Sequence, residues 1–272
     1  MTIYKSFDDF NNIDQVSFLK NGYIIKKIEN IDGFNTIKSS IKKIIESKYK
    51  NKLKNLNIFD DFHKILKKDK INPIRMNIYN SLNKKDWFKP TFFSLAKNTI
   101  ENIVSNELAM QSKINFSIMM PEDKSSNIPI HLDPHSGESP YQCVLWIPLT
   151  DVDKSKSIFI LPKKKNIKAQ KNFTNWMKKG GRNEVFKNVK NDIKWLKIQN
   201  GEFLIFSPNM IHGSVNNTTN ETRFSFNVRF KSLFSPYTSS EKGLGNFYTP
   251  IKVLPATNFG LDYLKIKKNF EK

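Results

Sequence analysis

The chain has 272 residues, of which 38% are apolar and 12% aromatic, and it carries a formal net charge of +20. This length and composition exclude a disordered or repetitive protein and predict a globular fold, most simply one domain over 1–272. The single cysteine, Cys143, excludes an internal disulfide framework and a multi-cysteine metal site.

The excess of lysine raises the question of a polyanionic partner. Because lysine is spread from Lys5 to Lys272, a solvated surface that steers anionic substrates is favoured over nucleic-acid binding. Residues 1–12 lack a basic start followed by an apolar stretch, and the chain has no run of about 18 apolar residues. We therefore expect a cytoplasmic protein without a membrane span.

The first third, 1–110, is predicted to be mostly helical. The string FLKNGYIIKKIE over 18–29 indicates a short strand or hairpin turning at a glycine. Apolar residues then recur at steps of three and four, which predicts an amphipathic helix over 31–49.

Two prolines divide the rest of this N-terminal part. Pro73 is expected to separate two helical pieces, and an amphipathic helix is predicted over 91–108, after Pro90.

The sequence pattern changes near residue 111, where short β-branched and aromatic runs begin between turn residues. These runs predict a β-rich sandwich or barrel over 111–236. The lysine-rich stretch 163–196 is expected to be a surface insertion with a short helix near 173–178. The tail 237–272 has little periodicity, but its aromatic residues indicate that it packs on the core; they are Phe247, Tyr248, Phe259 and Tyr263.

Three of the four histidines border β-rich segments. In IPIHLDPH, His131 and Asp133 stand two apart, so both side chains would project from one face of an extended strand and could bind one ion. Pro134 argues against a helical zinc pair of His131 and His135. His212, 81 positions further on (212 − 131), is the candidate third ligand. Two histidines and one carboxylate leave three positions open, which suits oxygen activation at non-haem Fe(II).

In the string TRFSFNVRF, Arg223 stands 11 residues beyond His212 (223 − 212). On a strand, Arg223, Ser225, Asn227 and Arg229 share one face, and apolar residues occupy the other. A buried guanidinium is costly without an anion, and it pairs bidentately with a carboxylate. 2-Oxoglutarate offers that carboxylate at C5, while its C1 carboxylate and C2 carbonyl chelate the metal; Ser225 could add a hydrogen bond.

The order HLD, distal histidine, R-x-S resembles the Fe(II)/2-oxoglutarate oxygenases. The blocks G-x-S-P-Y, W-I-P-L-T-D and K-S-x-x-I-L-P resemble, more narrowly, the phytanoyl-CoA dioxygenase-like superfamily and its StrG-like members from sporadic carbohydrate-biosynthesis clusters. The resemblance implies a mainly β fold with α, namely a double-stranded β-helix (jelly-roll, cupin-like) core with an N-terminal helical elaboration. It also implies dependence on Fe(II), 2-oxoglutarate and O2, and hydroxylation of a carbohydrate or nucleotide-linked sugar. Asp133 stands where related halogenases carry a small residue, which favours hydroxylation over halogenation.

Four further residues are weaker candidates. Gln142 and Trp146 share one face if 141–149 is a strand, so Gln142 could contact the cosubstrate and Trp146 could form a pocket wall; core packing competes equally. His135 and Arg229 could meet substrate, although Arg229 could equally pair with an acid or reach solvent.

Several functional alternatives stay open at this stage. A phytanoyl-type hydroxylase of an acyl or amino-acid substrate would use the same cosubstrate. A nucleic-acid demethylase would suit the charge and the paired arginines, and a hydrolytic zinc site accepts the same ligand types. The lysine-rich insertion could act as a lid for an anionic substrate.

Overall fold

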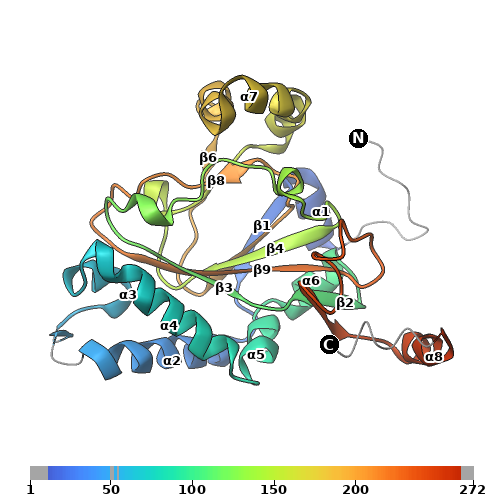
Figure 1. Cartoon of the computed structure of the whole chain (residues 1–272), viewed down its shortest axis with the longest axis horizontal. Helices are drawn as coiled ribbons and strands as arrows, with labels where there is room; N and C mark the ends of the chain where they lie inside the picture. Colours follow the sequence, from blue (N-terminus) through green and yellow to red (C-terminus); the bar gives the residue numbers. More distant parts are fainter. Residues whose placement is uncertain (1–11, 50–51, 54, 265–272) are drawn as a thin grey trace.

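Two antiparallel sheets carry the fold of the computed structural model (Figure 1). The structure describes residues 12–49, 52–53 and 55–264, so most of the opening stretch on which the expectation of no export signal rests lies outside the described residues. The large sheet has the order β1-β7-β4-β9-β2-β10, with β3 paired to β9. Its strands are β1 (Tyr23–Lys27), β2 (Leu108–Gln111), β3 (Asn115–Met119), β4 (Gln142–Pro148), β7 (Glu202–Phe206), β9 (Arg223–Ser232) and β10 (Tyr248–Lys252).

The small sheet has the order β6-β5-β8. Its strands are β5 (Phe159–Ile160), β6 (Lys194–Trp195) and β8 (His212–Gly213). Apolar side chains of both sheets meet in one buried cluster that includes Val144, Trp146, Ile160 and Leu204. The predicted sheet-rich core with attached helices is thus confirmed.

Strand β9 lies in the middle of the large sheet, between β4 on one side and β2 and β3 on the other. Its alternation is as predicted: one face carries Phe224, Phe226, Val228 and Phe230, all buried. These rings pack edge-on or tilted against aromatic residues of the helices, such as Phe92 against Phe226 with centroids 5.6 Å apart. The opposite face, which carries the arginines, therefore points to the space between the sheets.

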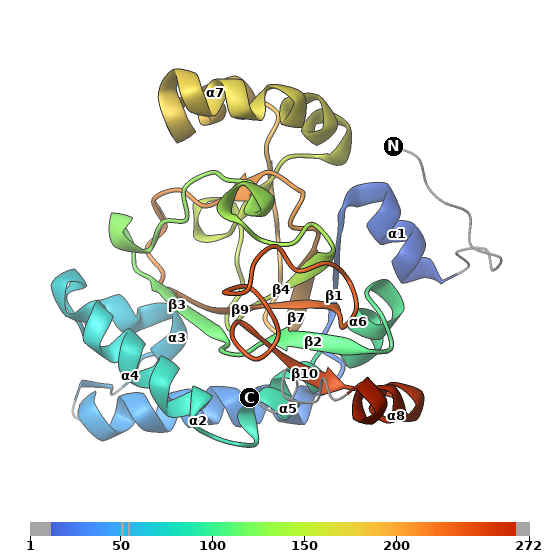
Figure 2. The ribbon, with the colours of Figure 1, turned by 45° about the vertical axis from the view of Figure 1, so that its right-hand side comes forward.

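Helices cover both sides of this sandwich. Figures 1 and 2 show α2, α4 and α5 beneath the large sheet, and α7 on the opposite side, beyond the small sheet. The helices are α1 (Ile13–Asn21), α2 (Ile31–Tyr49), α3 (Ile58–Asp61), α4 (Ile71–Asn83), α5 (Phe88–Ser94), α6 (Lys97–Ile103), α7 (Lys163–Val189) and α8 (Pro255–Leu264). Helix α2 matches the predicted range, and its buried residues recur at the expected steps of three and four.

Of the short strand or hairpin predicted over 18–29, the structure contains the single strand, β1, and a helix stands where a hairpin would need its first strand. Helix α1 occupies this part and ends at Gly22, whose φ of 81° and hydrogen bond from its N–H to the Phe18 carbonyl form a helix C-cap. Strand β1 follows at once. The glycine that the sequence pattern placed in a turn between strands thus separates a helix from a strand.

The single helix predicted over 91–108 is instead two shorter helices that end before 104. Helix α5 begins at Phe88, before Pro90, which is tolerated in the first helical turn. A second helix, α6, starts at Lys97 because the Glu29 carboxylate accepts hydrogen bonds from the backbone N–H of Asn98 and Thr99, at 2.8 and 3.0 Å. The chain then enters β2.

Pro73 likewise lies inside the first turn of α4 and does not split two helices.

The lysine-rich stretch forms a longer helix than predicted. Helix α7 spans 27 residues with a break at Gly180 and Gly181, where φ reaches 62°. Its buried side chains pack on β5 and on the segments before β8 and around Ile130. The helix therefore covers the small sheet directly.

The tail contributes a strand to the large sheet. Strand β10 pairs with β2, and Tyr248 is buried against Tyr237 and Phe247. Phe259 is 80% exposed, contrary to the expected packing, and the side chain of Tyr263 lies outside the described part. Among the described helices, none is both long and apolar enough to cross a membrane.

Candidate metal centre

Three side chains from distant parts of the chain converge between the sheets. Potential ligand atoms of His131, Asp133 and His212 all lie within 4.8 Å of one another. The Oδ1 atom of Asp133 is 3.1 Å from His131 Nε2 and 4.0 Å from His212 Nε2. The structure thus brings together the three residues that sequence spacing singled out, in a set able to bind one divalent ion.

A backbone bridge holds the two histidines side by side. The N–H of His131 donates to the His212 carbonyl at 2.9 Å, and the N–H of His212 donates to the His131 carbonyl at 3.1 Å. Asp133 lies two residues after His131, with the extended residue Leu132 between them. It begins a 3-10 turn, η5 (Asp133–Ser136), in which Pro134 stands near the start. The carboxylate thereby points back to the imidazoles.

Each imidazole is oriented by a carbonyl two residues earlier. His131 Nδ1 lies 2.9 Å from the Pro129 oxygen, and His212 Nδ1 lies 2.8 Å from the Met210 oxygen. A proton on Nδ1 satisfies these carbonyls, so Nε2 is left with the lone pair that a metal needs. The backbone therefore selects the tautomer that can bind an ion.

The electrostatics of the site favour the ligand-competent charge states. Burial, assisted by the nearby His131, lowers the pKa of His212 to about 4. Burial alone would raise the pKa of Asp133, but the hydrogen bond to His131 and the neighbouring positive charges hold it well below its ordinary value. At neutral pH the set offers a neutral imidazole and a carboxylate.

Arg229 pairs with the second carboxylate oxygen of Asp133. Its Nη2 lies 3.2 Å from Asp133 Oδ2, and its Nε lies 3.6 Å from Glu138 Oε2. Glu138 also pairs with Lys242 of the tail. Of the outcomes left open for Arg229, the structure gives pairing with an acid, and Oδ1 of Asp133 is left to face the histidines.

Arg223 is fully buried on the same face of β9. Its Nη1 donates to the carbonyl oxygens of Lys156 and Ser157 at 3.1 and 3.4 Å, while Nε and Nη2 have no hydrogen-bond partner among the residues described. Burial lowers its pKa to about 10, so it stays charged at neutral pH. The two free donors form one edge of the guanidinium, which fits a carboxylate.

The weaker candidates lie at different places. Ser225 is buried one period beyond Arg223 on the same face. Trp146 packs its ring 5.6 Å from the Arg223 guanidinium carbon. Gln142 pairs with Lys231 at the other end of β9, where its Oε1 accepts a hydrogen bond from the Tyr248 hydroxyl. His135 packs on Phe173 of α7, with ring centroids 4.6 Å apart.

Sequence reasoning missed the charged residues that hold these arginines. Glu138 and Lys242 flank Arg229, and Lys156 lies behind Arg223. Their partners are more than 60 residues away in the chain, so no local spacing indicates the contacts. Only the excess of polar residues near HLDPHSGESPY could have suggested a role for Glu138.

Comparison with known proteins agrees with this geometry. The family model described as phytanoyl-CoA dioxygenase (PhyH) matches residues 23–225. No curated protein matches the chain.

Solved structures with the same fold have low sequence identity to the chain. A non-heme monooxygenase, ThoJ in complex with nickel, has a TM-score of 0.56 and 12% identity, over 90% of this chain and 85% of its own. EctD from S. alaskensis, with 2-oxoglutarate and 5-hydroxyectoine, has a TM-score of 0.51 and 13% identity, over 85% and 79%. These likenesses confirm the jelly-roll oxygenase fold. The match over 23–225 covers most of the chain, which therefore belongs to the phytanoyl-CoA dioxygenase family of non-haem oxygenases that depend on iron and 2-oxoglutarate.

Proposed function

We propose that His131, Asp133 and His212 hold Fe(II) and that Arg223 holds the C5 carboxylate of 2-oxoglutarate. The observation that carries this assignment is the enclosed guanidinium, which keeps two donors without a partner in the described chain. It lies on the strand face whose other arginine contacts Asp133. A cosubstrate that chelates the metal at one end and carries a carboxylate at the other satisfies both groups.

The donor set suits iron in particular. Two imidazoles and one carboxylate with open positions are the ligand set of non-haem Fe(II) oxygenases. When bound, Fe(II) and 2-oxoglutarate supply the oxidising power that acts on a substrate C–H bond. The residues of the chain orient the groups: Arg223 fixes the far end of the cosubstrate, and Ser225 adds a hydrogen bond beside it. We assign Arg229 to holding Asp133 in place, and not to contact with substrate.

We further propose a polar small-molecule substrate, of the sugar class that the StrG-like resemblance implies. Gln142 supports this proposal, because its amide nitrogen is buried and unpaired within the described structure, next to the Tyr248 hydroxyl. A buried donor left unsatisfied selects a ligand that accepts hydrogen bonds, and an acyl chain has few such groups. Because Gln142 pairs with Lys231, at the opposite end of β9 from Arg223, we assign it to the substrate and not, as the sequence suggested, to the cosubstrate.

Reconstitution tests the proposed reaction. Protein loaded with Fe(II) and 2-oxoglutarate without oxygen is expected to form succinate once oxygen is admitted, and Zn(II)-loaded protein is expected to form none. Nucleotide-linked sugars should increase succinate release more than acyl-CoA thioesters or free amino acids do. Absence of succinate from the iron form would refute the proposed activity; stimulation by acyl thioesters alone would refute only the sugar class.

Replacing Arg223 tests the cosubstrate anchor. Arg223→Leu removes the charge-assisted pair, so we expect 2-oxoglutarate to bind roughly ten- to a hundredfold more weakly, since such a pair contributes about 1.5–3 kcal/mol. Calorimetric titration of the Ni(II)-loaded protein gives this affinity without turnover. The surface variant Arg182→Leu is the control, and unchanged affinity in Arg223→Leu would remove the assignment.

Replacing Arg229 tests its action on Asp133. Because Arg229→Met frees Oδ2 of the carboxylate, we expect the affinity for Ni(II) to fall about ten- to a hundredfold, as it does when outer partners of metal ligands are lost. Equilibrium dialysis against Ni(II) measures this change. Arg75→Met, at a half-exposed arginine of α4, should bind Ni(II) like the parent protein; an Arg229→Met protein that did the same would show that the contact has no such role.

Replacing Gly213 tests the backbone bridge between His131 and His212. A Cβ at this position would stand 2.9 Å from the Ile128 carbonyl oxygen and 3.0 Å from the Ile130 Cα, and both are backbone atoms. Gly213→Ala must therefore push the segment before His131 away from His212, and we expect Ni(II) affinity to drop at least about tenfold. Gly260→Ala, where a Cβ meets nothing within 4 Å, is the matched control. Equal Ni(II) affinities of the two variants would argue against a bridge that sets the ligand spacing.

A further inference from the structure

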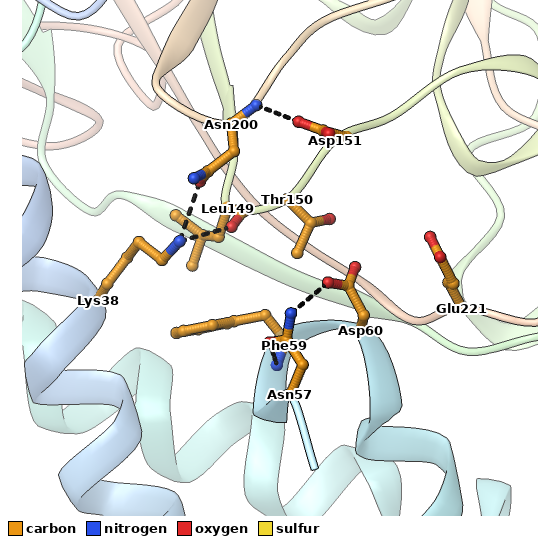
Figure 3. Close-up of a pocket in the computed structure, with 9 residues that line it drawn as sticks. All are labelled: Lys38, Asn57, Phe59, Asp60, Leu149, Thr150, Asp151, Asn200 and Glu221. Atoms are coloured by element: carbon orange, nitrogen blue, oxygen red, sulfur yellow. Dashed lines mark hydrogen bonds between the residues drawn. The ribbon is translucent and has the colours of Figure 1, made fainter. Parts of the chain in front are cut away.

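Lys156 is a buried ammonium held by two carboxylates. Its Nζ lies 2.9 Å from Asp60 Oδ1 and 2.6 Å from Glu221 Oε2, and only 3% of its side chain is exposed. Figure 3 shows both carboxylates on the wall of a cavity of about 280 Å³, whose lining does not include the candidate metal ligands. Two residues of the cavity wall, Asp60 and Glu221, therefore contact Lys156, whose carbonyl oxygen in turn contacts Arg223.

The backbone at Lys156 faces the opposite way, toward Arg223. The carbonyl oxygens of Lys156 and Ser157 accept the hydrogen bonds of Arg223 Nη1, at 3.1 and 3.4 Å. These two bonds leave the Nε and Nη2 edge of the guanidinium for a ligand. One residue thus binds carboxylates with its side chain and Arg223 with its main chain.

The turn that carries these carbonyls depends on distant contacts. It is a 3-10 turn, η6 (Lys154–Lys156), and Lys154 adopts a φ of 44°, which is unfavourable for a residue with a Cβ. A hydroxyl contact of 2.8 Å joins Ser155 to Thr218. The turn is therefore fixed on one side by this contact and on the other by the ion pairs of Lys156.

Asp60 connects the turn to the start of β9. Its carboxylate binds Lys156, and its carbonyl oxygen accepts the N–H of Thr222 at 2.7 Å, directly before Arg223. Asp60 lies in helix α3, one residue before its end, so a helical element outside the sheets contacts both the turn and the strand that meet at Arg223.

We propose that Lys156 is a positioning residue for Arg223, and that with Asp60 and Glu221 it sets the affinity for the distal carboxylate of the cosubstrate. This inference rests on the proposed function of Arg223. A buried ion pair is weak evidence for stability, because well-packed apolar residues often replace one without loss; it does fix a geometry. Here the ion pairs fix the positions of the Lys156 and Ser157 carbonyl groups. These carbonyls accept hydrogen bonds from Nη1 of Arg223 and so orient Nε and Nη2.

Binding of two 2-oxo acids separates positioning from general destabilisation. Lys156→Met keeps an unbranched side chain, one heavy atom shorter, and removes its charge. In the Ni(II)-loaded protein we expect 2-oxoglutarate to bind about tenfold more weakly, and 2-oxobutyrate, which chelates the metal but lacks the distal carboxylate, to bind unchanged. Lys252→Met is the control, because Lys252, in the edge strand β10, also forms an ion pair, with Glu101 of α6 at 2.8 Å.

Double substitution identifies the route of the effect. In an Arg223→Leu background, Lys156→Met should change the affinity for 2-oxoglutarate no further. Glu221→Gln, at a half-exposed side chain, should cause a smaller loss that again spares 2-oxobutyrate, and it serves if Lys156→Met does not fold. Equal losses for both acids, or additive losses in the double variant, would overturn the role of Lys156. If Arg223→Leu itself binds 2-oxoglutarate normally, the anchor assignment and this inference both fail.

Discussion

The charge of Arg223, enclosed between the sheets, is the constraint on which the arrangement of the site depends. A buried cation costs several kcal/mol unless its donors are satisfied, and the protein satisfies one of the three nitrogens. In the proposed function, the C5 carboxylate of 2-oxoglutarate would pair with the two remaining nitrogens. Cosubstrate binding would then stabilise the folded state as well as position the reactants, because only the folded chain presents this edge.

The N-terminal part and the C-terminal tail each support one of the two arginines of β9. Near Arg223, the helical N-terminal part contributes Asp60, which binds Lys156. Near Arg229, the tail contributes Lys242, which pairs with Glu138. Arg229 lies beside Glu138 and pairs with Asp133. The polar face of one strand is thus braced from both sides. The strands of the jelly-roll core determine where the two arginines lie. Their orientation depends in addition on residues of the N-terminal part and of the tail.

Local pattern was enough to predict the elements in which one face is buried. The alternation in β9, the apolar stripe of α2 and the His131–Asp133 spacing each follow from a short repeat, and the structure contains all three. Helix α1 was missed because a glycine suits a hairpin turn and a helix cap equally. The charged residues that contact the site from other elements were missed for a different reason. Lys156 and Asp60 are 96 residues apart in the chain, and only the completed fold brings such a pair together.

The tail contacts the end of the site that we assign to the substrate, and this position bears on the proposed specificity. Tyr248 fixes the oxygen of the Gln142 amide and so directs its nitrogen away from β10. Lys242 holds Glu138 in the same loop that begins with Asp133. The tail thus contacts both Gln142, at the start of β4, and Glu138, in the loop after Asp133. On the proposed assignment, a change of tail sequence would alter substrate choice and the orientation of Asp133 together, whereas the Arg223 end, which the N-terminal part contacts through Asp60, would keep its affinity for the cosubstrate.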